Sequence, residues 1–211
     1  MNRVVLRNAV LLDPETPSPE TGDLLLEGGR IAARLGTGER AGSDARNLDL
    51  AGSRLAPGFI DLHFHGALAF RDASDFEVVL DDAARSLMRH GTTAFLATTV
   101  AWPAPELAAR VTRLAAVLDG HSARAASPIG IHLEGPWIRS GAAGAQPRAA
   151  IRPFDPAEGE EILARGEGWV RMVTLAPEVE GVAVLEAALG RRGIAIALGH
   201  SLADADQVLA A

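Results

Sequence analysis

Residues 58–66 read GFIDLHFHG, and this stretch decides the fold of the larger part of the chain. The apolar run from Phe59 to His65 predicts a strand, in which alternate side chains share one face. Asp61, His63 and His65 therefore lie on one face, and three ionisable groups are costly to bury there without partners. A metal ion is one partner that would satisfy them, and a solvent-exposed face is the alternative.

The composition of the 211-residue chain narrows the class of protein. Hydrophobic residues make up 48% and charged residues 22%, which predicts a globular protein with a sizeable core. A net charge of -7 without a basic run argues against nucleic-acid and membrane partners. Cys is absent, which excludes disulfides and thiolate metal sites. The N-terminus has no signal-peptide pattern and no apolar run approaches about 18 residues, so we expect a cytoplasmic protein.

The chain divides near residue 55 into two predicted domains. Residues 1–55 carry short β-like runs between turn-rich segments, which predicts half of a small β-sandwich-like domain. In residues 56–211 apolar strand-like runs alternate with helical ones, which predicts βα units around a parallel sheet and an α/β fold. The β-like runs of the first domain are Val4–Leu6, Val10–Leu12, Leu24–Leu26 and Ile31–Ala33. The predicted strands of the second are 59–65, 92–98, 128–134, 170–175 and 194–200.

Metal-ligating residue types recur where these predicted strands end. His63 and His65 end the first strand of the second domain, Glu134 ends the third and His200 ends the fifth. In parallel α/β barrels the carboxyl ends of the strands form the active-site rim. Imidazole and carboxylate groups are the usual ligands of a zinc-type ion, and three or four of them with one open position indicate a catalytic site.

Three further residues, each close in sequence to one of these candidate ligands, have two interpretations. Asp61 either orients a ligating His or hydrogen-bonds backbone. His132 lies two residues before Glu134 on the same strand face, and it either reaches the site or packs within the sheet. Trp137 either lines a binding pocket or packs beneath the long loop 135–153.

Five blocks of the second domain resemble one known family. The blocks LAPGFIDLHFHG, GTTAFLATTV, GIHLEGPW, VTLAPE and GIAIALGHS are similar, in order and spacing, to the N-acetylglucosamine-6-phosphate deacetylase family of the amidohydrolase superfamily. The resemblance implies a (β/α)8 TIM-type barrel with a small β-sandwich domain built from both chain ends. Here it covers about five βα units, hence a partial barrel. The implied reaction converts N-acetyl-D-glucosamine 6-phosphate to glucosamine 6-phosphate and acetate.

The resemblance also implies the ligands and the cofactor. His63, His65, Glu134 and His200 are expected to bind one or two divalent ions, most simply zinc. All 20 basic residues are Arg, so the carboxylated Lys that bridges two metals in some amidohydrolases cannot form within this sequence. On the loop after GIHLEGPW, Ala145 and Gln146 align with substrate-binding positions, and Gln146 replaces a His of the family. The partner is a small amino-sugar phosphate, and the full-length protein is expected to be a homodimer.

The resemblance leaves part of the expected machinery outside residues 1–211. The general-acid Asp of the family belongs to the eighth strand, so we expect no catalytic acid within these residues and interpret the chain as an N-terminal part. Two alternatives stay open: an amidohydrolase acting on a different N-acyl substrate, and a non-enzymatic truncated product. Half of a barrel also has two open edges, which predicts association.

Overall fold

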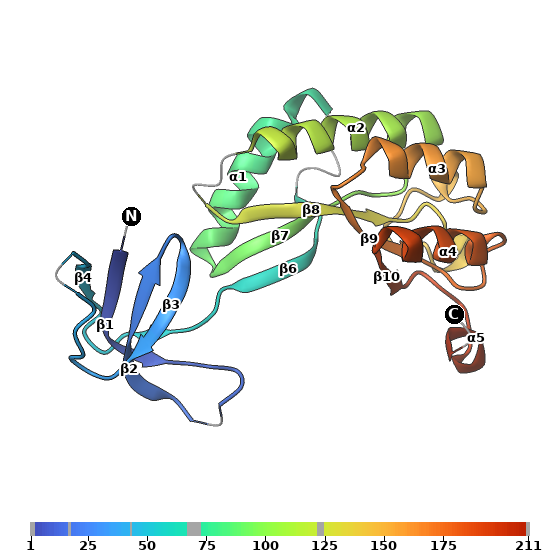
Figure 1. Ribbon diagram of the computed structural model, residues 1–211. Coiled ribbons are helices and arrows are strands. Elements are labelled where there is room, and N and C mark those ends of the chain that lie inside the picture. Colours follow the sequence, from blue (N-terminus) through green and yellow to red (C-terminus); the bar gives the residue numbers. More distant parts are fainter. Residues whose placement is uncertain (1–2, 17, 43, 67–72, 122–124, 210–211) are drawn as a thin grey trace. The chain divides into compact units, whose positions relative to one another are not determined.

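The computed structural model describes residues 3–16, 18–42, 44–66, 73–121 and 125–209. The chain forms two compact units, Met1–Gly58 and Phe59–Ala211. Each unit contains one five-stranded sheet (Figure 1). Among the described residues, no helix has the length and apolar character that a bilayer-spanning segment needs.

The first unit is a mixed sheet, as predicted for a small β domain. Its strand order is β3-β2-β1-β4, and β5 also pairs with β1. Strand β2 is antiparallel to β1 and β3, whereas β4 and β5 run parallel to β1. The strands are β1 (Arg3–Leu11), β2 (Glu20–Glu27), β3 (Arg30–Leu35), β4 (Arg46–Asp49) and β5 (Arg54–Leu55).

The first two predicted runs of this unit form one strand, β1, so the expectation of two separate strands was wrong. A register shift between Leu6 and Ala9 replaces the expected turn. Asn8 has a positive φ of 55°, which Asn tolerates better than most residues. Asp23, fully buried, accepts hydrogen bonds from the Asn8 N–H at 2.8 Å and the Arg7 guanidinium at 2.7 Å. The buried Asp23 carboxylate therefore stabilises the irregular backbone at Asn8 within a continuous strand.

The second unit is a curled parallel sheet with the order β10-β9-β8-β7-β6. Helices follow the strands in alternation, which confirms the predicted partial barrel of five βα units, and α1, α2 and α3 lie on one side of the sheet (Figure 1). The strands are β6 (Phe59–Phe64), β7 (Thr92–Thr98), β8 (Ser127–Glu134), β9 (Val170–Leu175) and β10 (Ala195–Leu198). The helices are α1 (Phe76–Arg89), α2 (Ala104–Gly120), α3 (Pro156–Arg165), α4 (Val182–Arg192) and α5 (Ala205–Leu209). Short 3-10 turns are η2 (Ala73–Asp75), η3 (Ser140–Ala142) and η4 (Arg148–Ala150).

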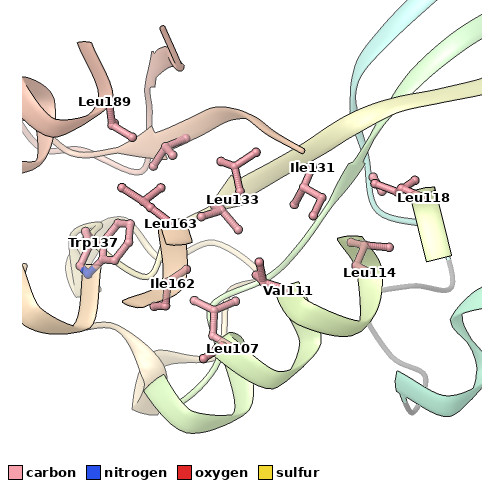
Figure 2. Close-up of a cluster of buried hydrophobic side chains, with 14 of the residues drawn as sticks. Leu107, Val111, Leu114, Leu118, Ile131, Leu133, Trp137, Ile162, Leu163 and Leu189 are labelled. Carbon is pink, nitrogen blue, oxygen red and sulfur yellow. The ribbon is translucent and has the colours of Figure 1, made fainter. Parts of the chain in front are cut away.

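The core of the second unit lies between this sheet and its helices. Helix α2 buries apolar side chains at helical spacing, and they face buried side chains of β8 (Figure 2). Asp155 caps the N-terminus of helix α3, because its carboxylate accepts a hydrogen bond from the Glu158 N–H at 2.8 Å. Each fully buried Leu, Ile or Val side chain contributes about 1.5–3 kcal/mol. The side chains concerned are Leu107, Val111, Leu114 and Leu118 of α2 with Ile131 and Leu133 of β8.

Strands β6 and β10 are the two edges of the sheet, and both expose apolar side chains. Ile60 and Leu62 of β6 are 60% and 47% exposed, and Leu198 of β10 is 41% exposed. Long apolar edges invite pairing with other chains. We therefore expect a polypeptide of these 211 residues to elute above its monomer mass of 22.0 kDa in size-exclusion chromatography with light scattering.

Lysine at the edges should reduce this association. Ile60→Lys places a charge on an edge strand, whereas Val184→Lys, at a 52% exposed position on α4, serves as the matched control. A monomeric wild-type chain that unfolds cooperatively at every concentration would show that the edges are harmless.

Candidate metal centre

Four predicted ligand residues come from three places in the second unit. His63 lies in β6 and His65 follows that strand directly. Glu134 is the last residue of β8, and His200 lies two residues after β10. Because all five strands run parallel, these positions share the carboxyl-end edge of the sheet.

The Glu134 carboxylate lies next to all three imidazoles. Its Oε1 lies 3.2 Å from His63 Nε2 and 2.9 Å from His200 Nε2, and its Oε2 lies 3.0 Å from His65 Nε2. The Glu134 side chain is 7% exposed, whereas that of His63 is 46% exposed, so the group opens to solvent on the His63 side. His63, His65 and Glu134 offer ligand atoms that all lie within 4.8 Å of one another. The structure thus brings three of the predicted ligands, all histidines, to the carboxylate of the fourth, Glu134.

Backbone carbonyls orient two of the rings. His65 Nδ1 lies 3.2 Å from the Thr98 carbonyl oxygen, and His200 Nδ1 lies 2.9 Å from the Ala142 carbonyl oxygen. A carbonyl only accepts, so each Nδ1–H donates and each Nε2 faces Glu134, where it donates to the carboxylate when it carries a proton and offers a lone pair to a metal ion when it does not. This is the usual arrangement of a metal-ligating His, with the outer nitrogen donating to backbone.

The donor set fits a bound cation. His63 Nε2 and His65 Nε2 lie only 3.0 Å apart, next to an ionised carboxylate. Lone pairs this close repel unless a proton or a metal ion lies between them. Two nitrogen ligands of one tetrahedral zinc-type ion lie roughly 3.3 Å apart, given bonds of about 2.0–2.1 Å. His63, His65 and Glu134 could therefore hold a metal ion with little rearrangement.

The electrostatics of the site keep Glu134 charged. Burial would raise the pKa of Glu134, but hydrogen bonds from His65 and His200 and the nearby His63 charge outweigh it and lower the pKa to about 2. Burial also acts on His200, but its bonds to the Ala142 carbonyl and to Glu134 prevail and raise the pKa of this ring. A cation at this site therefore meets an ionised carboxylate at neutral pH, as a metal ligand must be.

The loop residues Ala145 and Gln146 lie beside this group. Ala145 is exposed, whereas the Gln146 side chain is buried. Gln146 Oε1 accepts a hydrogen bond from the Ala101 N–H at 2.8 Å, and its Nε2 donates to Glu134 Oε2. The backbone N–H and the ionised carboxylate together fix which end of the amide is oxygen. Gln146 thus contacts the proposed metal ligand, a contact that the sequence did not indicate.

Loss of the Gln146 amide should weaken metal binding. Gln146→Leu keeps the size of the side chain and removes the N–H that holds Glu134, so we expect about 10-fold lower zinc affinity, the scale seen for outer-sphere partners. Competition with a chromophoric chelator measures the affinity. Gln207→Leu, on the exposed face of α5, is the control. Equal zinc affinity of Gln146→Leu and Gln207→Leu would mean that Gln146 does not act on the ion.

The three ambiguous residues now have definite surroundings. Asp61 Oδ1 accepts from the His63 backbone N–H at 3.0 Å, so it bonds backbone rather than an imidazole. His132 is 1% exposed, with Nδ1 2.8 Å from the Leu62 carbonyl oxygen and Nε2 2.7 Å from Thr174 Oγ1. Burial lowers the pKa of His132, which keeps the ring neutral within the sheet.

His132 and Trp137 each pack against another aromatic ring. The His132 ring meets the His63 ring edge-on at 4.9 Å and supports it from within the sheet. Trp137 is fully buried against Phe154 at 5.2 Å, so it packs beneath the loop and does not line an open pocket. Thr174 was not singled out in the sequence, although its register opposite Glu134 in the neighbouring strand would have placed it here.

Known proteins that are similar to this chain point to one family. The model of the amidohydrolase family matches residues 54–189. Human N-acetylglucosamine-6-phosphate deacetylase is 38% identical over 193 residues, which cover 86% of this chain and 46% of that protein. N-acetylgalactosamine-6-phosphate deacetylase of Escherichia coli O157:H7 is 33% identical over 157 residues, which cover 74% of this chain and 41% of that protein.

A solved structure shows the same fold. A mutant N-acetyl-D-glucosamine-6-phosphate deacetylase from Mycobacterium smegmatis, in complex with N-acetyl-D-glucosamine-6-phosphate, superposes with a TM-score of 0.77 at 33% identity. The match covers 98% of this chain and 52% of that one. The chain therefore spans about half the length of the relatives that it matches.

Proposed function

The chain belongs to the amidohydrolase family, and from this premise we propose that it carries the metal-binding part of a deacetylase acting on N-acetyl-D-glucosamine 6-phosphate. The products are glucosamine 6-phosphate and acetate. The observation that carries the proposal is the convergence of His63, His65 and His200 on the buried, ionised Glu134. The human relative at 38% identity bears the name of this activity.

In this proposal the ion is zinc, held by His63, His65, Glu134 and His200. When bound, a divalent ion lowers the pKa of water to about 7 and polarises the amide carbonyl of the substrate. The chain's residues fix the ligands: the Thr98 and Ala142 carbonyls orient two rings, and Gln146 orients the carboxylate. In this proposal substrate approaches from the side of His63, whose side chain is 46% exposed. The leaving amine needs a proton from a general acid, which the resemblance assigns to an Asp outside these residues.

The substrate assignment has one competitor. The relative from Escherichia coli O157:H7 bears the name of an N-acetylgalactosamine-6-phosphate deacetylase. The two sugar phosphates differ only in the configuration at C4, and both present the same acetamide. As the resemblance implies, the proposal includes a homodimeric, cytoplasmic protein with a small amino-sugar phosphate as its partner.

Acetate release tests the proposed reaction. The polypeptide, together with any residues that its gene encodes after Ala211, is stripped of metal, reloaded with zinc and given each of the two sugar phosphates. We expect acetate only after reloading, and more from the glucosamine derivative. Faster release from the galactosamine derivative would reassign the substrate, and no release from either would refute the proposed reaction.

A further inference from the structure

The carboxylate of Glu178 holds the segment that follows His200. Glu178 lies three residues beyond the end of β9, and its side chain is 12% exposed. Its Oε2 accepts from the Ser201 hydroxyl at 2.7 Å, and its Oε1 accepts from the Leu202 N–H at 2.6 Å. Both oxygens of this carboxylate thus accept from the two residues after His200, and Arg139 Nε lies 3.9 Å from Oε1.

His200 has a backbone conformation that needs such support. Its φ is 52°, in the left-handed region that residues with a Cβ rarely adopt. A strained residue of this kind persists only where its surroundings over-determine it. Here the Gly199 N–H donates to the Leu175 carbonyl at 3.0 Å, and the His200 carbonyl accepts from the Arg139 N–H at 2.9 Å. Glu178 provides the corresponding restraint on the other side of His200.

The strained turn has a consequence for the metal centre. The left-handed residue comes two positions after β10, and there His200 Nε2 lies 2.9 Å from Glu134 Oε1. The ring is also held by its Nδ1–H bond to the Ala142 carbonyl. If the backbone relaxed to negative φ, the direction of the Cα–Cβ bond would change and Nε2 would leave the carboxylate.

Glu178 is charged in this setting. Burial would raise its pKa, but the bonds from the Leu202 N–H and the Ser201 hydroxyl outweigh burial and lower it. Hydrogen bonds to an ionised acceptor are shorter and stronger than neutral ones, in accord with the 2.6 and 2.7 Å distances. None of the Glu178 bonds described here involves His63, His65 or Glu134, so any effect on the ion passes through His200.

We propose that Glu178 is a positioning residue for His200: it fixes Ser201 and Leu202 so that His200 keeps its left-handed backbone and presents Nε2 to a divalent cation. This role rests on the proposed function, because it requires His200 to be a ligand. It assigns a task to the Glu of the TLAPE block, which resemblance alone leaves without one.

A double-mutant cycle tests the role. Zinc affinity is measured by chelator competition for Glu178→Ala in the wild-type chain and in the His200→Ala chain. We expect about a 10- to 100-fold loss in the first background, as for other residues that orient a ligand, and no further loss in the second. Glu180→Gln is the matched control, since Glu180 is an exposed carboxylate two residues away.

A milder substitution tests the same role of Glu178. Ser201→Ala removes one of the two bonds and should give a smaller loss than Glu178→Ala, which keeps the proposal testable if Glu178→Ala fails to fold. Equal losses in both backgrounds, or none in either, would overturn the positioning role. If His200→Ala binds zinc as wild type while His63→Ala does not, the role of Glu178 fails and the metal centre stands. If the wild-type chain binds no zinc, the role of Glu178 and the metal centre fail together.

Discussion

Replacing His63 with alanine is expected to lower the zinc affinity of this chain by at least about 100-fold, beyond the 10- to 100-fold typical of outer-sphere partners. The reason is direct. His63 Nε2 lies 3.0 Å from His65 Nε2 and 3.2 Å from Glu134 Oε1, so its loss removes one of three atoms that face a common point. Chelator competition near neutral pH measures the change.

His90→Ala provides the control for this substitution. His90 is an exposed residue that directly follows the C-terminal end of α1. The His90→Ala substitution removes an imidazole and leaves the residues of the candidate centre unchanged. If His63→Ala and His90→Ala bound zinc equally well, the ion would have to bind elsewhere in the chain.

A polypeptide of residues 1–211 alone should release acetate at least about 1000-fold more slowly than an intact deacetylase. A general acid contributes about 100- to 10,000-fold, and the resemblance places this acid on an eighth strand, whereas the described residues supply five strands to the barrel sheet. Acetate release with added zinc measures the rate, with N-acetyl-D-glucosamine 6-phosphate as substrate.

The zinc-loaded Glu134→Ala chain sets the background for that measurement. A turnover number near about 1 per second, as in typical enzymes, would mean that residues 1–211 contain the acid themselves and that the catalytic groups have been assigned wrongly.

Local sequence patterns predicted the second unit well. The alternation of apolar runs and capped helices placed all five strands, and β9 spans the predicted residues 170–175. Strand β10 is shorter than predicted and ends at Leu198, because His200 turns the backbone away from the extended form. The β1 irregularity at Asn8 escaped prediction because Asp23, fifteen residues away in sequence, stabilises it.

Of the candidate site, only the residues at strand ends could be predicted from the sequence. His63, His65, Glu134 and His200 were accessible because parallel strands bring their carboxyl ends together. The contacts of Gln146 and Glu178 depend on how loops fold back across the sheet, and no local periodicity encodes that path. The ligand roles of the four residues, and a substrate role for Ala145 and Gln146, stay predictions for experiment.

The central claim is that one divalent ion binds among Glu134 and the three histidines around it, and crystallography at the zinc absorption edge tests it most directly. Crystals of the zinc-loaded chain are predicted to show one anomalous peak within about 2.0–2.2 Å of a Glu134 oxygen and of Nε2 of His63, His65 and His200. A zinc peak elsewhere, or no peak between these side chains at saturating zinc, would contradict the account.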